Sequence, residues 1–174
     1  MTKKARPRAL LKRLISWRRG FQIVFGLSLY LAISNWGISL WWVIAAGSAL
    51  GIFLGKFFCR WMCPMGAIME MMMGAGDEDG RKRSFYNYFK MGCPIAWAGG
   101  FLNRMSLFRV RVADASRCKS CNICDEACYV AQFAPGHSLH LKDLINPSTH
   151  FSCSRCLNCV KACPAGALTF QARL

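Results

Sequence analysis

The last third of the chain contains eight cysteines at repeated intervals. Residues 118–128 and residues 153–163 both follow the pattern C-x-x-C-x-x-C-x-x-x-C. Three thiolates separated by two residues can surround one face of a [4Fe–4S] cluster, and the fourth cysteine of such a run commonly ligates the neighbouring cluster. The spacing therefore predicts two [4Fe–4S] clusters. One has the ligands Cys118, Cys121, Cys124 and Cys163, and the other has the ligands Cys153, Cys156, Cys159 and Cys128.

Zinc is the alternative metal for these cysteines, because C-x-x-C pairs also occur in zinc sites. Zinc does not account for a third cysteine two residues further on, followed by C-x-x-x-C, and this chain has that pattern twice. The pattern therefore favours iron–sulfur clusters. Cluster motifs account for eight of the 11 cysteines, so a disulfide framework is not expected.

Three further cysteines precede the two motifs. Residues 59–67 and residues 159–167 share the pattern C-x-x-x-C-P-x-G-A, and another Cys-Pro pair begins at Cys93. The repeat suggests that Cys59, Cys63 and Cys93 bind a third redox or metal centre, with a fourth ligand from a partner or from a non-cysteine group. The alternative is that these are reduced cysteines that pack as small hydrophobic side chains.

Positive charge and apolar residues gather in the first third of the chain. Residues 1–20 contain eight Lys and Arg and no acidic residue, and residues 21–34 and 38–58 are almost wholly apolar. The intervals from Trp17 to Trp36 and from Trp42 to Trp61 correspond to about 28 Å of helix each, close to the thickness of a bilayer core. Because Trp and basic residues flank membrane spans, the pattern predicts a two-helix transmembrane hairpin with both ends in the cytoplasm.

This topology predicts a protein of the inner (cytoplasmic) membrane whose ferredoxin domain faces the cytoplasm. The alternative for residues 1–34 is a cleaved export signal, which the second apolar run disfavours. The net charge of +15 would also suit a nucleic-acid-binding protein. Since much of the basic excess directly precedes an apolar run, we expect a membrane partner and no nucleic acid.

The expected fold class is a membrane α-helical hairpin plus a small α+β bacterial-type ferredoxin domain with two [4Fe–4S] clusters. Residues 1–63 form the basic N-terminus and the hairpin, residues 64–112 form a cytoplasmic connector at the membrane interface, and residues 113–174 form the two-cluster domain. Basic and aromatic residues at 81–90 suit an interfacial segment. Alternation of apolar residues with arginine predicts a strand at 108–112, and a second strand is expected at 167–170.

The order of these features resembles that of membrane-bound polyferredoxins. The shared features are the basic N-terminus, the apolar runs, C-x-x-x-C-P-x-G-A, a later Cys-Pro, the sequence Ser-Leu-Phe-Arg-Val-Arg and two ferredoxin motifs. The most similar members are the NapH-type quinol dehydrogenase subunits of periplasmic nitrate reduction and the C-terminal iron–sulfur region of NosR-type proteins. The resemblance implies a subunit that moves electrons between the quinone pool and a partner oxidoreductase.

We therefore expect an iron–sulfur electron-transfer subunit, with quinone or quinol and the other subunits of a redox complex as partners. The sequence shows no flavin, molybdenum or Walker signature and no C-x-x-C-H haem motif, so substrate chemistry is expected in a partner. One alternative is an accessory protein for the assembly or maintenance of a metalloenzyme. Another is a redox sensor or scaffold whose clusters are structural.

Overall fold

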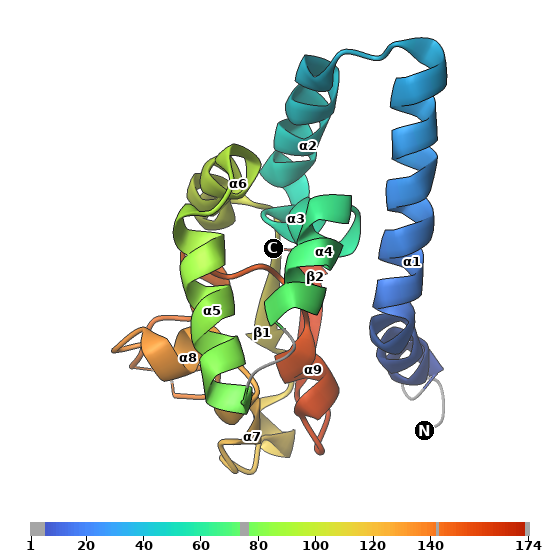
Figure 1. Cartoon of the computed structure of the whole chain (residues 1–174). Helices are drawn as coiled ribbons and strands as arrows, with labels where there is room; N and C mark the ends of the chain where they lie inside the picture. The colour runs from blue at the N-terminus through green and yellow to red at the C-terminus, as the bar shows by residue number, and fades with distance from the viewer. Residues whose placement is uncertain (1–5, 74–76, 142, 173–174) are drawn as a thin grey trace.

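A computed structural model describes residues 6–73, 77–141 and 143–172 of the chain, which are mostly helical with one two-stranded sheet (Figure 1). In chain order the elements are α1 (Arg6–Trp36), α2 (Leu40–Leu54), α3 (Phe57–Trp61), α4 (Pro64–Met73), α5 (Glu78–Met91), α6 (Pro94–Met105), β1 (Phe108–Val112), η1 (Ala115–Arg117), α7 (Ile123–Glu126), α8 (Tyr129–Phe133), η2 (Pro147–Thr149), α9 (Asn158–Ala162) and β2 (Leu168–Ala172).

The predicted transmembrane hairpin, and with it the predicted place in the inner membrane, is wrong. Within the described residues, no helix combines the length and the apolar character needed to cross a membrane. α1 has 31 residues, but Lys and Arg recur through its first half and Gln22 and Asn35 interrupt the remainder. α2 is apolar but has only 15 residues, which give about 22 Å of helix against a bilayer core of about 30 Å.

The second apolar run is interrupted at Gly55. This residue ends α2 with φ 62° and ψ −142°, and a Cβ there would lie 2.3 Å from Oδ1 of Asn103. Glycine is therefore the residue that fits the position. Lys56 then turns into the protein, where it is 1% exposed and its backbone N–H donates to Asn103. Trp42 and Trp61 consequently belong to different helices, and their spacing does not measure one span.

The basic N-terminal helix packs on the cysteine-rich part of the chain. α1 contacts α3, α4 and α9, and Ile15 shares a hydrophobic core with Cys159 and Val160. Nη1 of Arg18 donates to the carbonyl of Cys156 at 3.2 Å. These contacts place Arg18 beside the second cysteine motif, whereas the sequence had suggested a membrane surface as its surroundings.

The aromatic residues of α5 also face the interior. Phe85 and Phe89 are buried, and their rings lie 6.5 and 6.4 Å from the ring of Tyr129 at the start of α8. Asp77 begins the helix by accepting a hydrogen bond from the backbone N–H of Gly80. The expected interfacial segment at 81–90 therefore contributes to the protein core.

Both predicted strands are confirmed, and they pair with each other. β1 and β2 are antiparallel, with Val110 opposite Phe170. Val110 is buried in the middle of β1 while its neighbours are half-buried, which agrees with the alternation in the sequence. The sheet joins the segment before the first cysteine motif to the segment after the second, so both motifs are held between its strands.

Candidate metal centres

The four cysteines assigned to the first cluster surround one cavity. Cys118, Cys121, Cys124 and Cys163 line one small cavity, of about 20 Å³, whose wall is almost wholly apolar. Cys163 comes from the end of the second motif, so the cavity includes a cysteine from each motif. Burial, together with repulsion from Asp125 and Cys163, raises the pKa of the Cys124 thiol to about 11. Binding iron would require this thiol to lose its proton.

The other four assigned cysteines form a second group. Burial raises the pKa of the Cys159 thiol, and charge repulsion from Cys128, Cys156 and Cys153 raises it further. All four thiols therefore lie within electrostatic range of one another. Cys128 comes from the first motif, so this group also draws on both motifs. Its members Cys128, Cys153 and Cys156 pack against the hydrophobic core that contains Cys59.

The loops of both motifs share an uncommon backbone conformation. Within the described residues, the non-glycine residues with positive φ are Ser120, Asn122, Arg155 and Leu157. They flank the middle cysteine of each C-x-x-C-x-x-C run at equivalent positions. Such a conformation is costly for a residue with a side chain, particularly a bulky one such as Leu157, and persists where its surroundings enforce it. A cluster enclosed by each loop would supply that constraint.

Cys59, Cys63 and Cys93 lie near one another although they come from three different segments. Burial, together with charge repulsion from Cys63 and Cys93, raises the pKa of the Cys59 thiol to about 12. Cys63 and Cys93 each precede a proline, Pro64 or Pro94, that begins a helix. Proline suits the first helical position because its fixed φ matches the helix and it lacks an N–H that would be unpaired there.

The two copies of C-x-x-x-C-P-x-G-A fold alike only as far as their second cysteine. Cys59 and Cys159 both lie in five-residue helices. After the proline, the first copy continues as α4, whereas the second turns through Gly166, with φ 60°, toward β2. In the first copy the backbone N–H of Gly66 bonds to the sulfur of Cys63. In the first copy the start of α4 therefore lies next to the sulfur of Cys63, at the position where the second copy has the turn at Gly166.

The conversion of Gly66 to Ala should destabilise this part of the protein. A Cβ at Gly66 would lie 2.2 Å from the carbonyl oxygen of Cys59, so the backbone must shift, at a cost of about 1–3 kcal/mol. Gly20→Ala is the control, because no atom lies within 4 Å of its Cβ position and Ala favours a helix. Chemical denaturation followed by circular dichroism measures both; equal stability of the two variants would contradict the close packing.

Buried cations outnumber buried carboxylates around the cysteines. Arg18, Lys56, Arg60 and Arg155 are at most 6% exposed, and Glu70 is the buried carboxylate in the part of the chain that the structure describes. Burying cations without negative partners is strongly unfavourable. A [4Fe–4S] cluster with four thiolate ligands carries net negative charge. The surplus of buried cations therefore fits anionic clusters bound at these cysteines.

Lys56 lies between two of the cysteine groups. Burial lowers its pKa to about 8, while the thiolates of Cys59, Cys153 and Cys93 act in the opposite direction. Its Nζ donates to the carbonyl of Phe89. Lys56 therefore places one positive charge within reach of both the third and the second group, a role that the sequence did not indicate.

Tyr129 joins the two motifs by hydrogen bonds. Its hydroxyl donates to the carbonyl of Ser152 at 2.9 Å and accepts from the backbone N–H of Ser154 at 3.0 Å. The residue follows Cys128, at the position where Pro164 follows the last cysteine of the second motif. The two repeats therefore differ in sequence at the residue that links them.

His140 lies beside the first group and was not singled out by its spacing. A ligand atom from each of Cys124, Asp125 and His140 lies within 4.8 Å of the other two. Nδ1 of His140 is 3.2 Å from Oδ2 of Asp125, and the backbone N–H of Leu139 donates to the other carboxylate oxygen. Asp125 therefore fixes the segment around His140 against the wall of the first cavity.

Comparison with known protein families matches residues 34–82 to a 4Fe-4S binding domain. The matched residues include Cys59 and Cys63 and end before the two C-terminal motifs. A curated relative, an uncharacterized protein of Methanocaldococcus jannaschii, is 22% identical over 130 residues, which is 75% of this chain. The chain spans about a third of the length of that relative, with 36% covered. No solved structure shows significant similarity. The chain therefore contains an iron–sulfur, ferredoxin-like region, which supports the presence of a 4Fe-4S cluster.

Proposed function

We propose that the chain is an electron-transfer protein in which two [4Fe–4S] clusters and a third iron–sulfur centre act in series. Each four-cysteine group holds one cluster, with the ligands assigned from the sequence. When bound, such clusters accept and release single electrons. The order of motifs shared with NapH-type and NosR-type subunits supports the same function.

This proposal rests on the fourth cysteine of each motif, which lies close to cysteines of the other motif. Cys163 lines the cavity of the first motif, and repulsion from Cys153 and Cys156 contributes to the raised pKa of Cys128. If each motif gives its fourth ligand to the other cluster, the two clusters are held next to each other. Electron transfer between the clusters requires this proximity.

The groups lie in an order that leads toward the surface. Cys59 shares a core with Cys128 and Cys153 of the second group, and Cys159 of the second group shares a core with Cys163 of the first. Cys121, in the first group, is exposed. Electrons would therefore pass between the third centre and the first cluster by way of the second, and a redox partner would bind near Cys121.

The buried cations have a role in this function. Lys56 and Arg155 lie near Cys153, and Arg18 lies near Cys156. Positive charge in a poorly solvated interior stabilises the more negative, reduced state of a nearby cluster. These side chains should therefore raise the reduction potential of the second cluster relative to the more exposed first one.

The third centre is proposed at Cys59, Cys63 and Cys93. The family match over residues 34–82 supports iron–sulfur ligation in this region. A partner subunit or a non-cysteine group would supply the fourth ligand.

Cys63→Ser tests the third centre separately from the other two. Protein purified without oxygen should contain about twelve iron and twelve sulfide per chain, and the variant about eight of each. The variant should keep two clusters that dithionite reduces reversibly, because their eight ligands are intact. Identical metal content in the two proteins would leave Cys59, Cys63 and Cys93 as packing residues. Stoichiometric zinc without sulfide, or clusters that cannot be reduced, would contradict the proposed function as a whole.

The identity of the redox partner belongs to the same proposal. Exchange with quinone was expected from the resemblance to membrane-bound polyferredoxins, and the transmembrane hairpin that would bring the clusters to the membrane is not found within the described residues. We propose another protein of a redox complex as the partner. Identification of the proteins that copurify with the full chain tests this, and the recovery of metalloenzyme assembly factors alone would favour the accessory function instead.

A further inference from the structure

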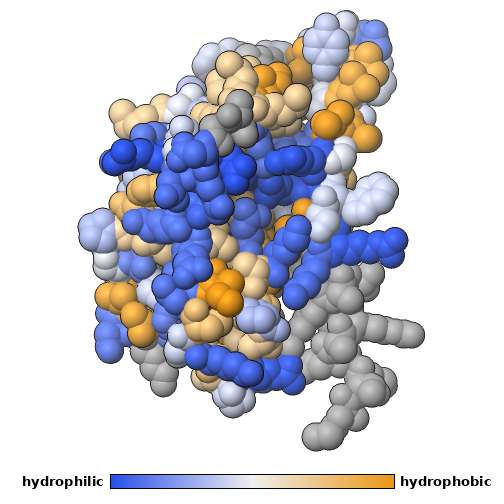
Figure 2. Space-filling view, turned by 60° about the horizontal axis from the view of Figure 1, so that its bottom comes forward, coloured by the Kyte–Doolittle hydropathy of each residue, from blue (hydrophilic) through white to orange (hydrophobic). Residues whose placement is uncertain are grey.

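A second feature of the molecule is a basic pocket next to the second cysteine group. The pocket has a volume of about 370 Å³ and lies between α1, the start of α5 and α9. Its charged lining residues are Arg18, Arg19, Arg60, Arg81, Lys161 and Glu70. Five cations and one carboxylate give this pocket, which we call the anion pocket, a net charge of +4. Figure 2 brings the bottom of the view in Figure 1 forward and shows many hydrophilic residues on that face.

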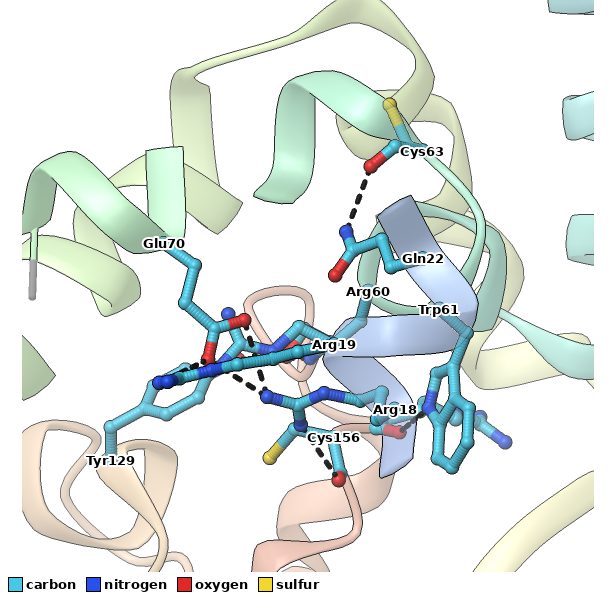
Figure 3. Close-up of polar contacts among 11 residues, drawn as sticks. Arg18, Arg19, Gln22, Arg60, Trp61, Cys63, Glu70, Tyr129 and Cys156 are labelled. Atoms are coloured by element: carbon cyan, nitrogen blue, oxygen red, sulfur yellow. Dashed lines mark hydrogen bonds and ion pairs between the residues drawn. The ribbon is translucent and has the colours of Figure 1, made fainter. Parts of the chain in front are cut away.

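Glu70 cannot neutralise the cations around it. Its Oε1 lies 2.8 Å from Arg18, 3.5 Å from Arg19 and 3.3 Å from Arg60, so three guanidinium groups share one carboxylate (Figure 3). Nε of Arg18 and both Nε and Nη1 of Arg60 are buried without hydrogen-bond partners. A carboxylate can fully pair with only one guanidinium in the two-bond geometry, so the arrangement leaves positive charge uncompensated.

The rim of the pocket adds cations that the proposed clusters do not explain. Arg81 is half-buried and Lys161 is exposed. Neither forms an ion pair with a carboxylate in the described part of the chain, although both line the same pocket as Glu70. Cations that gather around a hollow, with their charge uncompensated, attract anions.

We propose that the anion pocket binds a phosphate-type dianion, either inorganic phosphate or the phosphate group of a small molecule. Guanidinium groups match the oxygen geometry of phosphate, and a dianion offsets a surplus that a single carboxylate cannot. The volume of the pocket exceeds that of a lone phosphate, so it also has room for an organic portion of the ligand.

Binding is measured on the full, iron-loaded chain by titration calorimetry at low ionic strength in chloride buffer. One series uses inorganic phosphate and a second uses phenyl phosphate. We expect saturable binding of at least one of them at one site per chain, and tighter binding of phenyl phosphate would identify an organic phosphate as the ligand class. Failure of both probes to bind would overturn the proposal.

Variants at the rim separate the pocket from general basic charge. The double variant Arg81→Gln, Lys161→Gln should weaken binding about tenfold or more, because it removes two charge-assisted contacts. Arg83→Gln is the matched control: Arg83 is exposed on the same helix and does not line the pocket. Glu70→Gln should have the opposite effect and tighten phosphate binding, because it releases the guanidinium groups that the carboxylate now pairs with. If the Arg83 variant loses as much phosphate affinity as the rim variant, binding depends on net charge alone and the proposed site is wrong.

A second readout rests on the proposed clusters. Arg18 bonds to the carbonyl of Cys156, so a dianion in the pocket should lower the reduction potential of the second cluster, and the rim variant should lose this effect. Phosphate binding itself is measured without reference to the clusters. A failure of the iron–sulfur assignment and a failure of the anion pocket are therefore distinguishable.

Discussion

Replacing Cys128 with Ser should remove the cluster bound mainly by the second motif and spare the cluster of the motif to which Cys128 belongs. Charge repulsion from Cys153 and Cys156 contributes to the raised pKa of Cys128, while the cavity of the first motif is lined by Cys163. Loss of one of four thiolate ligands should cost most of the iron of that cluster, about four atoms per chain. Iron and sulfide analysis with electron paramagnetic resonance of the reduced protein measures the loss.

Cys163→Ser is the reciprocal variant. It should lose the more exposed cluster near Cys121 and keep the buried one, because Cys163 is the ligand that the second motif contributes to the first cavity. The two variants should therefore lose different signals and the same amount of iron. If each variant instead loses the cluster of its own motif, the exchange of ligands is wrong and each motif binds its cluster alone.

Replacing Arg155 with Met should be among the most destabilising changes that leave every cysteine in place. Nη2 of Arg155 donates to the carbonyls of Asn103 and Ser148 and to Oγ of Ser106, at 3.2, 3.3 and 2.5 Å. The side chain is 1% exposed, so Met would leave these acceptors short of donors in a dry interior and remove a cation beside Cys153. We expect a loss of about 3 kcal/mol or more.

The rate of cluster loss in urea, followed by visible absorbance, measures this effect, because unfolding with release of the cluster is irreversible. Arg155→Lys should fall between the wild type and Arg155→Met, since it keeps the charge but cannot reach all three acceptors. Arg83→Met is an exposed control with an expected effect within about 0.5 kcal/mol. If Arg155→Met loses its clusters at the same rate as this control, the hydrogen bonds of Arg155 do not stabilise the loop of the second cysteine motif.

The sequence by itself determined the two cysteine motifs and their spacing. Ligand spacing in an iron–sulfur motif is a local property, because a short loop must present its thiolates to one cluster. The assignment of the eight cysteines to two clusters stays a prediction, and it agrees with the lining of the first cavity and with the charge repulsion around Cys159. The strand at 108–112 was predictable for a similar reason, since alternation of apolar and polar residues reports directly on a half-buried strand.

The membrane hairpin was predicted wrongly because hydropathy treats each apolar run as an isolated helix. Gly55 breaks the second run where Asn103, far along the chain, approaches its backbone too closely for any side chain. Lys56 then becomes part of the interior through Asn103 and the carbonyl of Phe89. None of these contacts is visible in the local pattern.

The charged interior was also decided only by the tertiary structure. Arg18, Lys56 and Arg60 look in the sequence like cations of a surface or a membrane edge, yet they are buried. The groups that Arg18 meets are distant along the chain: Glu70 is 52 residues away and Cys156 is 138 residues away. Whether a cation is buried depends on which groups the fold brings to it, because the energy of a buried charge is set by its neighbours in space.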